Sequence, residues 1–137
     1  MQDEVILDAS VAAKVFITEA DSESARALAG SGTQLIAPDL IFAEVASVAV
    51  KRLRRGDISL SLAEAMVGSL ASLISEAVPI AGLANRAFKL AADHGLSAYD
   101  ATYVALAEKR GCDLVTADLR LIALVSRSGL SVVVRTA

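Results

Sequence analysis

Short apolar runs rich in Val, Ile and Leu alternate along this chain with longer segments of helical character. Strands are predicted over residues 5–7, 35–37, 76–79, 113–116 and 130–134, and at 76–79 the chain has room for only a minimal strand. The sequence has neither a sustained two-residue alternation, which would indicate β-hairpins, nor an internal repeat. This order favours a doubly wound, mostly parallel sheet of about five strands with helices on both faces.

The segments between these runs have helical periodicity and helical end signals. Helices are predicted to open at 9–13 and to cover 22–28, 40–55, 59–74, 82–93, 97–108 and 118–128. The chain of 137 residues is expected to form a single domain over 1–137, since its 55% hydrophobic content supports one sizeable core. Only 4% of the residues are aromatic, so Ala, Val, Leu and Ile must fill that core, as in helices packed on a buried sheet.

The charge balance limits the partners that the chain can attract. A formal net charge of -3 gives no overall positive field, so binding to nucleic acid would have to be local. The lone Cys112 has no intramolecular disulfide partner and the first residues are acidic, which predicts a cytoplasmic protein. No membrane association is expected, because the longest apolar run, 40–50, is short and contains Glu44.

Four acidic residues stand where an α/β sheet presents side chains to a ligand. Asp8 and Asp118 follow predicted strands, so both are expected at the carboxyl edge of the sheet, where such folds bind ligands. Glu44 interrupts the apolar run 40–50, and Asp100 lies near the start of an otherwise apolar helix. Each of these acids has a structural explanation as well as a functional one.

For three of these acids the alternative is a helix cap. Ser97 and Asp100 have the spacing of a capping box, and Asp8 and Asp118 each precede a predicted helix. Any one of them alone is as well explained by a cap as by a ligand site. Their coincidence at one sheet edge favours the site.

Several kinds of active site lack the residues that they need. With one His and one Cys, the chain has no zinc cluster and no conventional Ser/His/Asp triad, and His94 and Cys112 are assigned no catalytic role. No phosphate-binding glycine loop is present. Met66 and Tyr99 are expected to pack in the core, with stacking on a base as the alternative for Tyr99.

Converging carboxylates repel one another unless a cation lies between them, and Mg²⁺ or Mn²⁺ prefers such oxygen ligands. Such a cation orients and activates water and neutralises charge on a phosphoryl group, which are the requirements of phosphodiester hydrolysis. Ser10 and Thr116, each two residues from one of the acids Asp8 and Asp118, are predicted to orient carboxylates or water.

Basic residues offer local contacts for RNA phosphates. Lys51 and Arg55 belong to the densest basic cluster, although cations there also complement a helix C-terminus. Glu44 lies roughly on one helical face with Ser47, Lys51 and Arg55. Its alternative role is therefore to belong to a polar, solvent-exposed stripe of this helix. Lys14 is nearer in sequence to Asp8.

Four motifs in this order resemble the PIN-domain nucleases, specifically the VapC toxins of bacterial and archaeal toxin-antitoxin pairs. They span nearly the whole chain, and the Tyr-Asp-Ala stretch is the most distinctive. The motifs are Asp8-Ala9-Ser10, Pro38-x-Leu40-x-x-x-Glu44-Val45, Ser97-Ala98-Tyr99-Asp100-Ala101-x-Tyr103-Val104-Ala105-Leu106-Ala107 and Val115-Thr116-Ala117-Asp118-x-x-Leu121.

The resemblance implies a three-layer α/β/α sandwich and Mg²⁺- or Mn²⁺-dependent endoribonuclease activity, with the acids carried over as Asp8, Glu44, Asp100 and Asp118. It also implies a homodimer and a VapB-like antitoxin, through which alone operator DNA is bound. Ser47 stands where relatives often have Asn, so no polar contact is carried over at that position.

Other classes of protein share some of these features. A receiver-like signalling module also has an acidic Mg²⁺ pocket, but it needs a Lys after the last strand, where this chain has Arg135, and it does not explain Glu44. A haloacid-dehalogenase-like phosphatase would require a second Asp at position 10, which is Ser. A PIN fold without catalytic activity, acting only by binding, is the third alternative.

Overall fold

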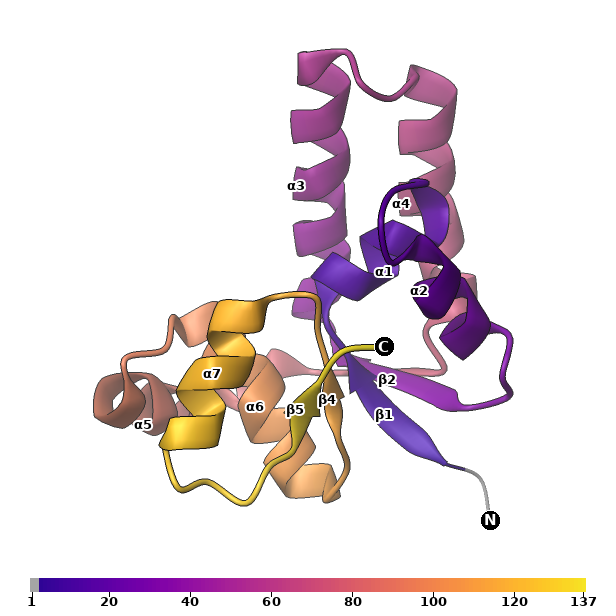
Figure 1. Ribbon diagram of the computed structural model, residues 1–137. Coiled ribbons are helices and arrows are strands. Elements are labelled where there is room, and N and C mark those ends of the chain that lie inside the picture. Colours follow the sequence, from indigo (N-terminus) through magenta and orange to yellow (C-terminus); the bar gives the residue numbers. More distant parts are fainter. Residues whose placement is uncertain (1–2) are drawn as a thin grey trace.

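The computed structural model describes residues 3–137 and contains one five-stranded sheet within them (Figure 1). The strand order is β3-β2-β1-β4-β5, and each neighbouring pair is parallel. The strands are β1 (Glu4–Leu7), β2 (Gln34–Pro38), β3 (Glu76–Val78), β4 (Leu114–Val115) and β5 (Val134–Arg135). This order differs from the 2-1-3-4-5 order of receiver modules, which argues against that alternative.

The helices occupy the segments between the strands and follow the predicted order. They are α1 (Ala9–Phe16), α2 (Ser22–Ala29), α3 (Leu40–Arg55), α4 (Leu60–Leu73), η1 (Ile80–Gly82), α5 (Ala84–His94), α6 (Ala98–Arg110) and α7 (Leu119–Arg127). The prediction for 82–93 began too early, because a short 3₁₀ turn, η1, precedes α5. None of the helices in the described residues has both the length and the apolar character of a membrane span.

The last strand was predicted over 130–134 but pairs only at Val134–Arg135. β4 is two residues long, and its ladder with β5 is closed by hydrogen bonds from Leu114 N to Val133 O and from Thr116 N to Arg135 O. The segment before Val133 is occupied by the turn that follows α7, in which Gly129 has a φ of +77°. The apolar run therefore contributes to the core mostly outside the sheet.

The apolar side chains of the central strand point alternately to two separate cores. Val5 and Leu7 belong to the core covered by α1 to α4, whereas Ile6 belongs to the core covered by α5 to α7. Figure 1 shows these two groups of helices on opposite sides of the sheet. The three-layer α/β/α architecture expected from the sequence is confirmed, because a strand buried on both faces requires helices on both.

The strand order reverses at β1, which lies between β2 and β4. In open parallel sheets this reversal leaves a crevice beyond the carboxyl ends of the two central strands. Asp8 directly follows β1, and Asp118 lies three residues after the end of β4. Both acids are therefore at the edge where the sequence analysis expected a site.

Candidate functional site

Asp8 is a buried carboxylate held by two hydroxyl groups. Thr116 Oγ1 donates to Asp8 Oδ2 over 2.7 Å, and Ser10 Oγ donates to the same oxygen over 2.8 Å. The Asp8 side chain makes no capping hydrogen bond to α1. The capping alternative for Asp8 is therefore wrong, since its carboxylate turns toward the carboxyl edge of the sheet.

The same two hydroxyls also hold the loop that carries Asp118. Asp118 N donates to Thr116 Oγ1 over 3.1 Å, and Ala117 N donates to Ser10 Oγ over 3.1 Å. Ser10 and Thr116 thus join the start of α1 to the β4–α7 loop, 106 residues apart in sequence. They fix the separation of the segments that bear Asp8 and Asp118.

Asp118 caps α7. Its Oδ1 accepts hydrogen bonds from Arg120 N over 3.0 Å and from Leu121 N over 3.2 Å. The capping prediction for this residue is confirmed. The cap uses one carboxylate oxygen, so it is compatible with a ligand role for the other.

Glu44 lies in the second turn of α3, and its Oε1 accepts a 2.6 Å hydrogen bond from the hydroxyl of Tyr103. The glutamate is half-buried, whereas Ser47, Lys51 and Arg55 are exposed, so the solvent-stripe alternative for Glu44 is wrong. Tyr103 was missed as a site residue in the sequence analysis. The available signal was its position three residues after Asp100, which places both side chains on one face of α6.

Asp100 combines the two roles that its sequence context suggested. Its backbone N donates to Ser97 Oγ over 3.0 Å, which caps α6. Its half-buried carboxylate lies 3.8 Å from the guanidinium of Arg120, at the start of α7. The cap orients the first turn of α6 while leaving the carboxylate at the sheet edge.

The acids influence one another electrostatically. Burial raises the pKa of Glu44, and the nearby charges of Asp8 and Asp100 raise it further, while the Tyr103 hydrogen bond opposes this. Burial likewise raises the pKa of Asp100, with added contributions from Asp8 and Asp118. The four carboxyl groups therefore form one set of mutually repelling charges.

The donor chemistry of this set suits Mg²⁺ or Mn²⁺, because all four side chains offer carboxylate oxygens and a cation would relieve their repulsion. Within residues 3–137, however, no three Asp, Glu, His or Cys side chains are grouped closely enough to hold a metal ion. The close convergence expected from the sequence is thus not seen in the described part of the chain. The residues fit the cation in kind, and the assignment of all four as ligands stays a prediction.

The structure separates the three predicted RNA-binding residues. Lys14 lies one turn after Ser10 on α1, with only 18% of its side chain exposed. Lys51 and Arg55 lie toward the far end of α3, and at 1.5 Å per residue Arg55 is about 16 Å along the helix axis from Glu44. Of the three, Lys14 is therefore the one near the acids.

Two large side chains at this edge are exposed. Tyr99, predicted to pack, is 63% exposed, and Leu119 is 72% exposed. Tyr99 directly precedes Asp100, and Leu119 directly follows Asp118. Because α6 begins at Ala98, the Tyr99 side chain projects outward from the first helical turn and does not reach the core, unlike Met66, whose predicted burial is confirmed.

Comparisons with known proteins agree with this architecture. The family model described as PIN domain matches residues 5–126. Ribonuclease VapC3 of Pyrobaculum aerophilum is 36% identical over 119 residues, covering 85% of this chain and 91% of that protein. Ribonuclease VapC9 of Mycobacterium tuberculosis is 34% identical over 117 residues, covering 85% of this chain and 87% of that protein.

Two solved structures share the fold at lower identity. Mycobacterium tuberculosis VapC20, a sarcin-ricin loop cleaving toxin, superposes with a TM-score of 0.71 at 20% identity, covering 87% of this chain and 93% of that one. VapBC2 from Rickettsia felis, bound to a DNA fragment from its promoter, has a TM-score of 0.68 at 10% identity, covering 98% of each chain.

Proposed function

This chain belongs to the PIN-domain family, and on that premise we propose that it is an endoribonuclease that hydrolyses RNA phosphodiester bonds with the help of Mg²⁺ or Mn²⁺. The observation that carries the proposal is the set of four electrostatically coupled carboxyl groups at the point where the strand order reverses. Mutual repulsion of this kind weakens the fold, so its presence at a ligand-binding edge indicates a functional role.

In this proposal Asp8, Glu44, Asp100 and Asp118 hold the cation, directly or through water. Bound there, the cation would lower the pKa of a water molecule and neutralise charge on the phosphoryl group. The protein supports this arrangement by fixing Asp8 through two hydroxyls, as described above, and Glu44 through Tyr103.

Asp100 is one of two acids, with Glu44, whose raised pKa suits it to accept a proton from the attacking water. Its pKa is raised by burial and by Asp8 and Asp118, which moves a carboxylate toward the range of a general base. Arg120 is 66% exposed and lies 3.8 Å from Asp100, so its guanidinium is available to a phosphate that enters the site. Arg120 is therefore a proposed phosphate contact.

The test is cleavage of RNA by purified wild-type protein and by the variants Asp8→Asn and Asp100→Asn, with and without a chelator. Each Asn keeps the size of the side chain and removes its charge, so the variants should fold and lose metal-dependent cleavage. Asp93→Asn, an exposed acid on α5, serves as the matched control and should cleave normally. Cleavage by Asp100→Asn at the wild-type rate would refute the assignment.

We propose further that the chain is the toxin of a toxin-antitoxin pair, binds a VapB-like antitoxin and forms a homodimer. Relatives that carry the VapC name and the VapBC complexes of the same fold support the pairing. An apolar groove between α3 and α4 supports a protein partner, because three large side chains on it, Val50, Leu60 and Val67, are 43%, 57% and 46% exposed.

We assign this groove to the antitoxin, which would bury the exposed apolar side chains. The test is co-expression of the chain with the product of a neighbouring antitoxin gene. Val67→Asp should abolish co-purification while the variant alone keeps its fold. Ser69→Asp, which adds the same charge at an exposed position of the same helix outside the groove, should not. Unchanged co-purification of Val67→Asp would place the antitoxin elsewhere.

A further inference from the structure

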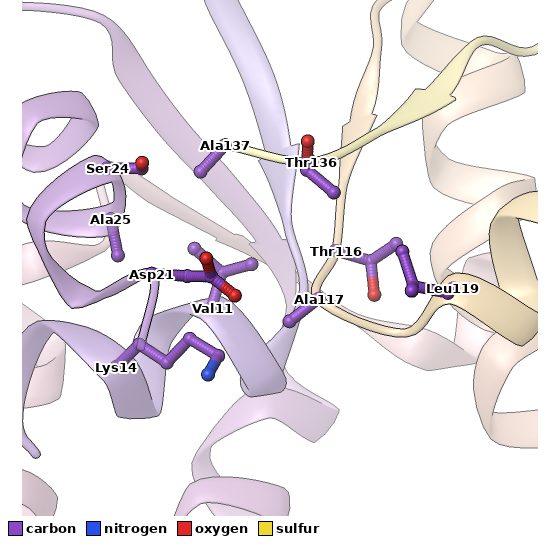
Figure 2. Close-up of a pocket in the computed structure, with 10 residues that line it drawn as sticks. All are labelled: Val11, Lys14, Asp21, Ser24, Ala25, Thr116, Ala117, Leu119, Thr136 and Ala137. Atoms are coloured by element: carbon purple, nitrogen blue, oxygen red, sulfur yellow. The ribbon is translucent and has the colours of Figure 1, made fainter. Parts of the chain in front are cut away.

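A pocket of about 230 Å³ opens beside the acids, between α1, α2, the β4–α7 loop and the last residues of the chain (Figure 2). Its wall includes Thr116, whose hydroxyl donates to Asp8 over 2.7 Å, so the pocket is one hydrogen bond away from the proposed catalytic edge. The lining residues are Val11, Lys14, Asp21, Ser24, Ala25, Thr116, Ala117, Leu119, Thr136 and Ala137.

Two oppositely charged side chains reach into this pocket. Figure 2 shows the Asp21 carboxylate extending from the α1–α2 loop across the space, with the Lys14 side chain below it. Lys14 Nζ donates to Glu19 Oε1 over 3.4 Å and to Ala20 O over 3.2 Å, and an ammonium group has a third proton to donate. The Asp21 carboxylate is exposed and, within residues 3–137, has no hydrogen-bond or ion-pair partner in the protein.

The backbone of Asp21 is held in a conformation that a non-glycine residue seldom adopts. Its φ is +72°, and among residues 3–137 it is the one non-glycine residue with a positive φ. Asp and Asn adopt this left-handed conformation more readily than other non-glycine residues, so it suits the acid at this position. The turn thus places an exposed acid, with no partner in the protein among residues 3–137, at the pocket.

The neighbouring contacts that impose this conformation are internal to the α1–α2 loop. The buried Ser22 hydroxyl donates to Ile17 O over 2.8 Å and accepts from Glu19 N over 2.9 Å. Arg26 Nε donates to Val15 O over 3.1 Å from the following helix. The loop is thus organised before any ligand arrives, which lowers the entropic cost of binding.

The chemistry of the pocket fits one flat heterocycle with a polar edge. Val11, Ala25, Ala117 and Leu119 offer apolar contacts for a ring beside a space of about 230 Å³. A carboxylate accepts two parallel donors, and Lys14 donates to an acceptor beside them. Guanine is the RNA base whose edge presents two adjacent N–H donors next to a carbonyl oxygen.

We propose, resting on the proposed ribonuclease function, that this pocket binds the guanine base of a nucleotide that flanks the scissile phosphate. Asp21 accepts from the N1–H and N2–H groups, and Lys14 donates to O6. The pocket then selects the cleavage position, while the acids beyond Thr116 carry out the chemistry.

The binding test uses guanosine 5′-monophosphate, titrated into isotope-labelled protein in metal-free buffer and followed by NMR. Shifts should be confined to the pocket, and the adenosine, cytidine and uridine monophosphates should bind at least tenfold more weakly. Asp21→Asn keeps the side-chain size and tolerates the positive φ, but presents an N–H to the base, so it should weaken guanosine monophosphate binding about tenfold. Glu23→Gln, in the first turn of α2 and outside the pocket, is the matched control and should bind as the wild type does.

Mapping of cleavage positions in an RNA of mixed sequence separates this proposal from the proposed function. The wild type and Glu23→Gln should cut beside guanine, and Asp21→Asn should lose that preference. Cleavage without base preference, together with equal binding of the four nucleotides, would overturn the pocket and leave the ribonuclease standing. The opposite result is also possible: the wild type binds guanosine monophosphate selectively, but the Asp100→Asn variant still cleaves RNA. That result would overturn the ribonuclease site and leave the pocket standing.

Discussion

Replacing Tyr103 with Phe tests the contribution of one buried hydroxyl group to the candidate site. Tyr103 is 1% exposed, and its hydroxyl donates to Glu44 Oε1 over 2.6 Å. Phe fills the same volume except for the hydroxyl oxygen, so the apolar packing of α6 is preserved. A change in stability therefore reports the loss of the hydroxyl, which donates to Glu44 and also interacts with the backbone of Ala9.

The expected loss follows from the charge and the burial of the acceptor. A hydrogen bond to a charged group contributes about 1.5–3 kcal/mol. Because Glu44 is only half-buried, water partly replaces the lost donor, and we expect the lower end, about 1.5 kcal/mol, at neutral pH. A protonated Glu44 keeps only a neutral hydrogen bond with Tyr103, so at low pH we expect a loss of roughly 0.5–1 kcal/mol.

The pH dependence has a definite sign. The pKa of Glu44 is raised above its ordinary 4.5, so the folded state holds this proton more tightly than the unfolded state does. The stability that comes from this proton is complete below pH 4.5 and is lost as the pH rises through the folded-state pKa. Removing the Tyr103 donor raises the pKa of Glu44 further, so the variant should lose more stability than the wild type over this rise.

The assay is urea unfolding of metal-free protein at neutral pH and near pH 4.5, the ordinary pKa of glutamate. Tyr99→Phe is the matched control, because Tyr99 is on the same helix and 63% exposed, and its free energy of unfolding should change by less than about 0.5 kcal/mol. A loss below about 0.5 kcal/mol for Tyr103→Phe at neutral pH, or an equal loss at both pH values, would refute the reasoning.

Three further predictions concern stability. Asp100→Asn removes one of the mutually repelling charges, so in metal-free buffer its melting temperature should match or exceed the wild-type value, and added Mg²⁺ should stabilise the wild type but not the variant in thermal unfolding. Met66→Ala empties a fully buried position in α4 and should cost about 2–5 kcal/mol in urea unfolding, so a loss below about 1 kcal/mol would contradict this packing. Gly68→Ala in α4 has open space around the new Cβ and should stabilise by about 0.5–1 kcal/mol, whereas Gly56→Ala should destabilise because φ there is +78°; equal effects would contradict the assignment.

Much of the fold was predictable because its signals are local. The bounds of α3 follow from apolar periodicity and from a glycine whose left-handed conformation ends the helix. The two-residue β5 was misplaced, because its length depends on the length of its partner strand and not on its own apolar run. The three-layer architecture could be inferred because buried parallel strands require helices on both faces.

The sequence by itself determined which residue types are available and which of them meet at one edge. Asp8 and Asp118 follow strand runs, and the carboxyl ends of parallel strands share an edge wherever the strands pair. Their chemistry, four carboxylates with no competing catalytic side chains, was therefore predictable from the sequence alone.

Only the tertiary structure decided which partner each acid has. The contact between Glu44 and Tyr103 joins residues 59 positions apart, and Arg120 reaches Asp100 from a different helix. It also placed Lys14 beside a pocket with Asp21, and Lys51 and Arg55 far along α3. Such pairings depend on the packing of helices against the sheet, and local periodicity carries no information about that distance or orientation.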